Sequence, residues 1–136
     1  MIPISVAALM VRDNRVFLGK RRDGSMRGFW ELPGGKCELG ETPEEALRRE
    51  LREELDLEVE VDRRCVSVRF FHRGKERELQ VFRVHETNQA WTPPVELPEH
   101  TETGWFSTRE LANMKATLVD SDREALSRLP GMLLKD

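Results

Sequence analysis

The stretch Gly35–Leu57, GKCELGETPEEALRRELREELDL, decides the fold because it leads from a glycine-containing loop into a strongly patterned helix. Within it, Thr42-Pro43-Glu44-Glu45 is typical of a helix start. Threonine can cap free backbone N–H groups, proline at the first helical position loses no hydrogen bond, and Glu45 can complete a capping box. We therefore expect a helix from this point to about Leu55.

Three glutamates of the predicted helix share one face. Positions i, i+3 and i+4 lie on the same side of an α-helix, so Glu50, Glu53 and Glu54 project together. Apolar residues lie within or beside the same arc, namely Ala46, Leu47 and Leu51. Carboxylates that border an inward-packing face are costly to bury unless a cation compensates them, which favours a metal site.

A solvated Glu–Arg surface is the competing interpretation of this helix. It offers two ordinary i, i+4 support pairs, Glu44–Arg48 and Glu45–Arg49. It does not explain Glu50 and Glu54, which are like charges at i, i+4 and should repel each other by roughly a few tenths of a kcal/mol. On the helix alone, both interpretations stay open.

The loop before the helix favours the metal site. The segment Leu32-Pro33-Gly34-Gly35-Lys36 contains paired glycines, which permit positive φ and a close approach of the backbone to a ligand. Magnesium accepts backbone carbonyls and carboxylates while it keeps some waters. Loop and helix together predict a Mg²⁺ site, with Mn²⁺ as an alternative ion.

The spacing of these residues is similar to the signature of the Nudix hydrolase family, G-x5-E-x7-R-E-U-x-E-E-x-G-U, in which U is aliphatic. The matching residues are Gly35, Glu41, Arg49, Glu50, Leu51, Glu53, Glu54 and Leu57. Asp56 replaces the final glycine, and an aspartate there has to end the helix in left-handed or capping geometry at some cost. The likeness extends over Gly28–Pro33 and Glu99–Ser107, and it is greatest to the MutT-like branch.

This resemblance implies a fold and a set of metal-site roles. The fold is a single α/β domain over residues 1–136, a Nudix α/β/α sandwich with a mixed β-sheet and a loop-helix-loop Nudix box. The implied metal ligands are the Gly34 carbonyl and the carboxylates of Glu50, Glu53, Glu54 and Glu99. Arg49 would orient these glutamates through salt bridges, and either Glu50 or Glu99 would be the general base.

The resemblance also implies substrate contacts outside the box. Arg22 and Lys36 are candidates for contact with phosphate, and Asp122 is a candidate hydrogen-bond acceptor for the edge of a nucleobase. Each has a plainer alternative. Isolated basic residues are usually surface residues, and Asp122 or Asp120 could serve as a helix-start carboxylate favoured by the macrodipole.

Composition fits one soluble domain. The chain has 136 residues, of which 38% are hydrophobic and 35% charged, and a net charge of −3. This balance offers no basic surface for a nucleic-acid backbone, and no apolar run of about 18 residues predicts a membrane span. Cys37 and Cys65 lack CxxC spacing, which predicts reduced thiols and a cytoplasmic location. Monomer and homodimer both stay open.

Patterns of strands and turns complete the expected fold. A hairpin is expected around the turn Asp13-Asn14. It joins two strands, Ile4–Val11 and Val16–Lys20. Three strands should follow the box helix, Glu58–Val61, Val66–His72 and Glu78–His85. After an irregular Pro-rich loop over Trp91–His100 come the strand Gly104–Phe106, a short helix capped by Ser107 and a last helix, Asp120–Leu129.

The function implied is a Mg²⁺-dependent nucleoside triphosphate pyrophosphohydrolase that releases a nucleoside monophosphate and pyrophosphate, with an oxidised purine or a cytidine nucleotide as the leading substrates. The cation would neutralise the phosphate chain and stabilise the leaving pyrophosphate. Hydrolysis of another nucleoside diphosphate derivative, such as ADP-ribose or a nucleotide sugar, is the enzymatic alternative. A non-catalytic nucleotide-binding module is a further one, although every glutamate of the box is present.

Overall fold

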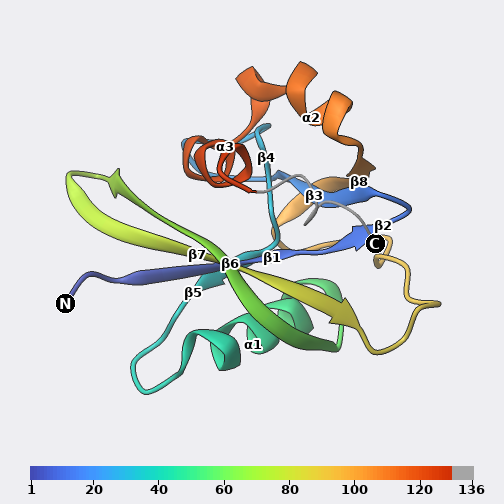
Figure 1. Ribbon diagram of the computed structural model, residues 1–136, viewed down its shortest axis with the longest axis horizontal. Coiled ribbons are helices and arrows are strands. Elements are labelled where there is room, and N and C mark those ends of the chain that lie inside the picture. The colour runs from blue at the N-terminus through green and yellow to red at the C-terminus, as the bar shows by residue number, and fades with distance from the viewer. Residues whose placement is uncertain (130–136) are drawn as a thin grey trace.

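The computed structural model describes residues 1–129 and contains two four-stranded sheets, with helix α1 on one side and helices α2 and α3 on the other (Figure 1). The first sheet has the order β5-β1-β7-β6, with bounds Gly34–Lys36, Ile4–Leu9, Lys75–Glu86 and Val59–His72. The second has the order β2-β3-β4, with bounds Val11–Arg12, Arg15–Arg21 and Trp30–Glu31, and β8 (His100–Phe106) pairs with β3. The helical elements are α1 (Pro43–Leu55), α2 (Thr108–Asn113), the 3₁₀ turn η1 (Lys115–Thr117) and α3 (Asp120–Ser127).

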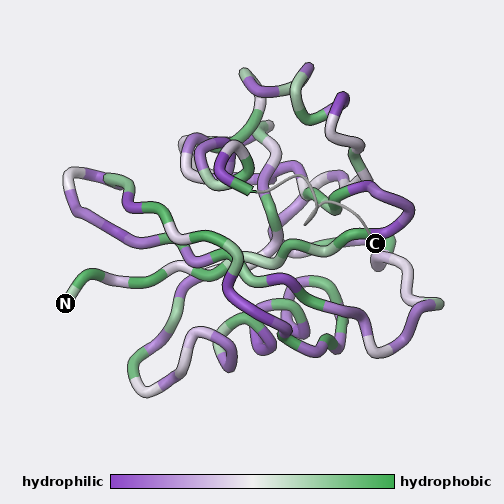
Figure 2. The backbone as a smooth tube through the Cα atoms, viewed as in Figure 1, coloured by the Kyte–Doolittle hydropathy of each residue, from purple (hydrophilic) through white to green (hydrophobic). Residues whose placement is uncertain are grey.

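The central strand β1 divides the core into two layers. It runs parallel to β7 and antiparallel to β5, which makes the first sheet mixed. Its side chains alternate, because successive residues of a strand point to opposite faces. Val6 and Ala8 pack with α1, whereas Ala7 and Leu9 pack with α3. In Figure 2 the hydrophobic residues of β1 run through the centre of the molecule. The predicted mixed sheet, covered on both faces, is confirmed.

The expected N-terminal hairpin is only partly correct. Asp13 and Asn14 form the turn with φ of 52° and 59°, and the strand after it, β3, contains the predicted strand Val16–Lys20, but the strand before it is the two-residue β2. The predicted strand Ile4–Val11 divides at Met10, where the chain passes from the first sheet to the second. The reason lies in the strand pairing, because β1 pairs with β5 and β7 in the first sheet, whereas Val11 and Arg12 pair with β3 in the second.

Helix α1 forms as the sequence predicts. Thr42 caps its start, accepts a hydrogen bond from the Glu45 backbone N–H and completes a capping box with the Glu45 side chain. At the other end Asp56 adopts the left-handed conformation, with φ of 50° and ψ of 46°, and its N–H donates to carbonyls of the last turn. An aspartate therefore takes the position of the signature glycine without displacing the helix end.

Several strand boundaries after the box helix differ from the expectation, and β7 begins at Lys75 and not at Glu78. The two strands predicted around residues 58–72 are one continuous strand, β6, because irregularities at Val61/Arg63 and Arg64/Val66 absorb the break in pattern. Strand β8 begins at His100 and not at Gly104, so part of the predicted Pro-rich loop belongs to the sheet. Ser107 caps α2 as predicted. No helix within residues 1–129 is both long and apolar enough to cross a membrane.

Candidate functional site

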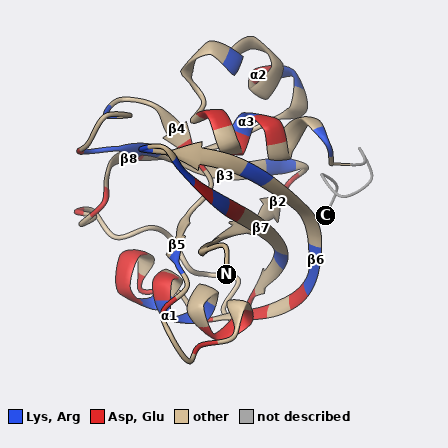
Figure 3. Cartoon of the chain, turned by 90° about the vertical axis from the view of Figure 1, so that its left-hand side faces the viewer, with Lys and Arg blue, Asp and Glu red and all other residues tan. Residues whose placement is uncertain are grey.

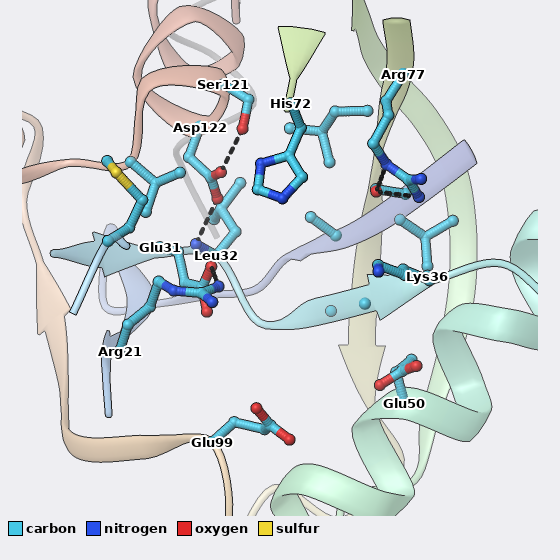
Figure 4. A pocket seen from close by; sticks show the side chains of 18 of the residues that line it. Arg21, Glu31, Leu32, Lys36, Glu50, His72, Arg77, Glu99, Ser121 and Asp122 are labelled. Carbon is cyan, nitrogen blue, oxygen red and sulfur yellow. Dashed lines mark hydrogen bonds and ion pairs between the residues drawn. The ribbon is translucent and has the colours of Figure 1, made fainter. Parts of the chain in front are cut away.

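A cavity of about 560 Å³ opens between the two sheets, the box helix and the start of α3 (Figure 4). Strands β1 and β5 form one wall, and the β6–β7 hairpin and the loop before β8 contribute further residues. Six of the residues expected from the sequence line it, namely Gly34, Lys36, Glu50, Glu54, Glu99 and Asp122. Three others, Arg22, Arg49 and Glu53, are not part of its lining.

Carboxylates gather at one end of the cavity, which we call the acid floor and define as Glu50, Glu54 and Glu99. The Glu54 side chain is buried, and its Oε2 has no hydrogen-bond partner within residues 1–129. Burial is the main cause that raises the pKa of Glu54 to about 9. The other causes are a hydrogen bond that protonated Glu54 donates to Glu50, and the charges of Glu50, Glu99 and Glu31. Without a cation the Glu54 carboxyl therefore stays protonated at neutral pH, which removes the repulsion between Glu50 and Glu54.

Two glycines shape the backbone beside the acid floor. A side chain at Gly35 would collide with the Glu50 carboxyl group, and one at Gly34 would collide with the Val6 carbonyl. Glu50 can therefore lie against the backbone of β5 only because position 35 has no Cβ. This is the physical basis for the paired glycines of the sequence.

The acid floor fits a hard divalent cation. The orphaned Glu54 oxygen and the adjacent Glu50 carboxylate are donors that such an ion prefers. The described part of the chain does not hold three acidic, histidine or cysteine side chains in one ready-made metal cluster.

Arg49 ties the loop to the box helix. Its Nε and Nη2 donate to the two carboxylate oxygens of Glu41 at 2.7 and 2.9 Å, and its Nη1 lies 3.1 Å from Glu50 Oε1 and 3.2 Å from Glu53 Oε2. The Arg49 hydrogen bond lowers the pKa of Glu41 to about 2. Glu53 itself faces solvent, since 60% of its side chain is exposed. Figure 3 shows the acidic residues along α1.

Asp122 lies in the opposite wall of the cavity, beside His72 (Figure 4). Its Oδ2 accepts from the Leu32 backbone N–H at 2.8 Å, and Ser121 Oγ donates to its Oδ1 at 3.1 Å. Burial and the charge of Glu31 raise the pKa of Asp122 to about 7 despite these two hydrogen bonds. The carboxyl group therefore combines a donor and an acceptor form near neutral pH.

Sequence reasoning missed several residues of the cavity wall. Arg21 and Glu31 form an ion pair at 3.0 Å, and Glu31 also lies 3.0 Å from His100 Nε2. Glu31 belongs to the matching segment Gly28–Pro33, so the resemblance carried a signal for it. His72 and Arg77 enter the wall through the β6–β7 hairpin, and only the strand pairing brings them there.

Arg22 and Lys36 occupy different environments. Lys36 lies on β5 at the edge of the cavity. The guanidinium of Arg22 instead donates through Nη2 to the backbone carbonyls of Leu97 and His100, at 3.0 and 3.1 Å. The two basic residues are therefore not equivalent candidates for contact with phosphate.

Comparisons with known proteins agree with the geometry. A family model described as NUDIX domain matches residues 1–129. The chain is 36% identical to the CTP pyrophosphohydrolase of Escherichia coli (strain K12) over 77% of its own length and 76% of that protein. It is 49% identical to an 8-oxo-dGTP diphosphatase of Proteus vulgaris, but over 41% of its own length and about half, 51%, of that protein.

A solved structure shares the whole fold. The crystal structure of a MutT NUDIX hydrolase from Burkholderia pseudomallei superposes with a TM-score of 0.78 at 29% identity. The match covers 96% of this chain and 99% of that one. The arrangement of two sheets between helices is therefore shared over nearly the full length.

Proposed function

The chain belongs to the NUDIX domain family, and we propose that it is a Mg²⁺-dependent nucleoside triphosphate pyrophosphohydrolase. Water would attack the phosphate chain and release a nucleoside monophosphate and pyrophosphate. The observation that carries this proposal is the acid floor, where a buried Glu54 oxygen without a partner lies beside Glu50 in an open cavity. Such a floor repels a bare polyphosphate and accepts one that arrives with a divalent cation.

The residues of the box would share the work of holding the substrate. A bound Mg²⁺, or Mn²⁺ in its place, would supply charge neutralisation of the phosphates and of the leaving pyrophosphate. Its proposed ligands are the Gly34 carbonyl and the carboxylates of Glu50, Glu53, Glu54 and Glu99. Glu53 needs a side-chain rotation for this role, because it now pairs with Arg49. Arg49 would keep Glu50 in place through their 3.1 Å contact.

A carboxylate of the acid floor would accept the proton of the attacking water. Glu50 and Glu99 both border the cavity and are both candidates for this general base. Glu54 is less suited in the cation-free protein, because its raised pKa leaves it protonated. If Glu50 is the general base, its contact with Arg49 would hold its carboxylate in place. The position of Glu99 depends instead on the loop before β8.

The opposite wall would bind the nucleobase. Asp122 and Ser121 present hydrogen-bonding groups in the cavity, and an exocyclic amino group could donate to the Asp122 carboxylate. Guanine, adenine and cytosine all carry such a group, so the wall is compatible with the oxidised purine and cytidine nucleotides named for the two relatives. Lys36 would contact the phosphates.

The two cysteines, Cys37 and Cys65, form no disulfide, and free thiols fit the cytoplasm as the location in which the protein works.

Turnover of a nucleotide panel tests the proposal. We expect purified protein with Mg²⁺ to hydrolyse at least one triphosphate among CTP, dCTP, 8-oxo-dGTP and the common nucleotides. Glu54→Gln should lose this activity, and Glu44→Gln, an exposed glutamate of the same helix, should keep it. Tight nucleotide binding without turnover of any compound would contradict the proposal and favour a binding module. Turnover of ADP-ribose or nucleotide sugars alone would favour the other hydrolase class.

A further inference from the structure

Glu99 lies on a four-residue segment, Leu97–His100, that carries it into the cavity (Figure 4). The side chains at the two ends of this segment are buried, with 7% of Leu97 and 2% of His100 exposed. Leu97 packs in the core layer of α1. Glu99 between them is exposed, so the segment is an arch whose two ends are anchored in the protein.

Arg22 bridges the carbonyl groups of this arch. Its backbone N–H donates to the Glu99 carbonyl at 3.0 Å. Its Nη2 donates to the Leu97 carbonyl at 3.0 Å and to the His100 carbonyl at 3.1 Å. One residue thus contacts the backbone of Glu99 and the backbone on both sides of it.

The anchor at His100 is itself fixed. The ring Nε2 lies 3.0 Å from Glu31 Oε2, and the ring packs so closely on Gly19 that a Cβ there would lie 2.6 Å from it. The pairing of β3 with β8 shifts by one residue at this point, because Lys20 pairs with Glu102 and Arg21 pairs with His100. β-bulges of this kind change the direction of side chains next to active sites.

These contacts leave Arg22 Nη2 without a spare donor. A guanidinium Nη2 carries two N–H groups, and the two carbonyls of the arch take both. Arg22 is also absent from the lining of the cavity, in contrast to Lys36. The geometry therefore does not favour a contact of this nitrogen with substrate phosphate.

We propose that Arg22 is a positioning residue that holds Glu99 in place within the acid floor, and not a phosphate contact. The inference rests on the proposed function, because it takes Glu99 as a ligand of the divalent cation. Loss of the Arg22 side chain would free the carbonyls at both ends of the arch while the charge of Glu99 stays. The position of Glu99 as a ligand of the cation would become less defined. The contacts between the nucleotide and the protein would stay unchanged.

The experiment compares Arg22→Ala with Glu99→Gln and with the double variant. Arg109→Ala, an exposed arginine of α2, is the matched control. Mn²⁺ affinity is measured by electron paramagnetic resonance without nucleotide, and kcat and KM are measured with Mg²⁺. We expect Arg22→Ala to weaken Mn²⁺ binding about tenfold or more, in the range known for residues that orient metal ligands. The nucleotide KM at saturating Mg²⁺ should stay within about twofold, and Arg109→Ala should match wild type.

The double variant separates positioning from a direct contact. If Arg22 acts through Glu99, Arg22→Ala adds little to the loss of Mn²⁺ affinity already caused by Glu99→Gln. Independent, multiplying effects would overturn the proposal, as would a nucleotide KM raised about tenfold with unchanged Mn²⁺ affinity. If Arg22→Ala does not fold, Arg22→Met replaces it. Methionine keeps an unbranched apolar stem but has no N–H group for the two carbonyls, so weakened Mn²⁺ binding supports positioning and wild-type Mn²⁺ binding contradicts it.

Failure of this proposal is distinguishable from failure of the proposed function. A wild-type protein that hydrolyses no nucleotide would overturn the function alone, because the Mn²⁺ titrations do not depend on turnover. A wild-type protein that hydrolyses a triphosphate, together with an Arg22→Ala variant of unchanged Mn²⁺ affinity, would overturn the positioning role alone.

Discussion

The carboxyl group of Glu50 occupies the space that a side chain at Gly35 would fill. The loop and the helix of the box are therefore fitted to each other at atomic contact. A methyl group at position 35 has to displace the carboxylate, and displacements of about 1 Å at a catalytic group cost on the order of 100-fold in rate.

We accordingly predict that Gly35→Ala lowers kcat/KM roughly 100-fold while the protein stays folded. The control is Gly40→Ala, where a Cβ meets nothing within 4 Å but φ is +86°. That variant should lose about 1 kcal/mol of stability through backbone strain and keep its activity. Steady-state kinetics and urea unfolding measure both effects. Wild-type kcat/KM in Gly35→Ala would show that the position of Glu50 does not matter.

Glu54 should couple the stability of the protein to the cation. Because its buried Oε2 has no partner within residues 1–129, a Mg²⁺ ion bound to the folded state as proposed would satisfy a group that is otherwise orphaned. At a Mg²⁺ concentration 100 times the Kd, the stabilisation of wild type should reach about 2.7 kcal/mol. Thermal unfolding with and without Mg²⁺ should show this shift in wild type and Glu44→Gln, but not in Glu54→Gln. Equal shifts in all three would remove Glu54 from the site.

Asp122 should make stability depend on pH. Its pKa is raised from 3.8 to about 7 in the folded protein, so the folded state holds a proton that the unfolded state has already lost in this range. The contribution of this group to stability is therefore complete below about pH 4 and is lost between about pH 4 and pH 7, at about 1.4 kcal/mol for each unit between the two pKa values.

Asp122→Asn isolates that dependence, since an amide oxygen can still accept from the Leu32 N–H. We predict that the stability of the Asn variant relative to wild type rises between pH 4 and pH 7 and then levels off. Denaturant unfolding at a series of pH values gives the comparison. A difference that stays constant over this range would mean that Asp122 is ionised in the folded protein throughout.

Asp56 carries a local strain that can be removed. It ends α1 in the left-handed conformation, which costs an ordinary residue about 1–2 kcal/mol and glycine little. We predict that Asp56→Gly stabilises the protein by up to about 1 kcal/mol with unchanged kcat, whereas Asp56→Ala destabilises it. If glycine destabilises the protein, the aspartate side chain makes a favourable contribution that outweighs its backbone strain.

Local signals made the box helix and the two helical glutamates of the acid floor predictable, whereas Glu99 followed only from the family resemblance. The cap at Thr42 and the periodic spacing of Glu50 and Glu54 act over a few residues, and the structure has both where they were expected. Spacing alone could not show that the side chain of Glu54 is buried whereas that of Glu53 is exposed. Helical geometry puts the two glutamates on one broad face, but packing against β1 and β5 buries only Glu54.

Long-range pairing was beyond the reach of the sequence. The division of the first predicted strand at Met10 depends on the pairing of β1 with β5 and β7. No sequence pattern near Met10 indicates this division. The environment of Arg22 is similar, because its partners are 75 and 78 residues away in the chain. A basic residue at the end of a strand predicts a charge at that place, but only the fold shows which carbonyls take its hydrogen bonds.

The identity of the products tests the central claim most directly. Phosphorus-31 NMR of the wild-type reaction with Mg²⁺ and the best triphosphate should show pyrophosphate and a nucleoside monophosphate in equal amounts, and Glu54→Gln should produce neither. Orthophosphate with a nucleoside diphosphate, or no triphosphate cleaved while a nucleoside diphosphate derivative is consumed, would contradict a nucleoside triphosphate pyrophosphohydrolase.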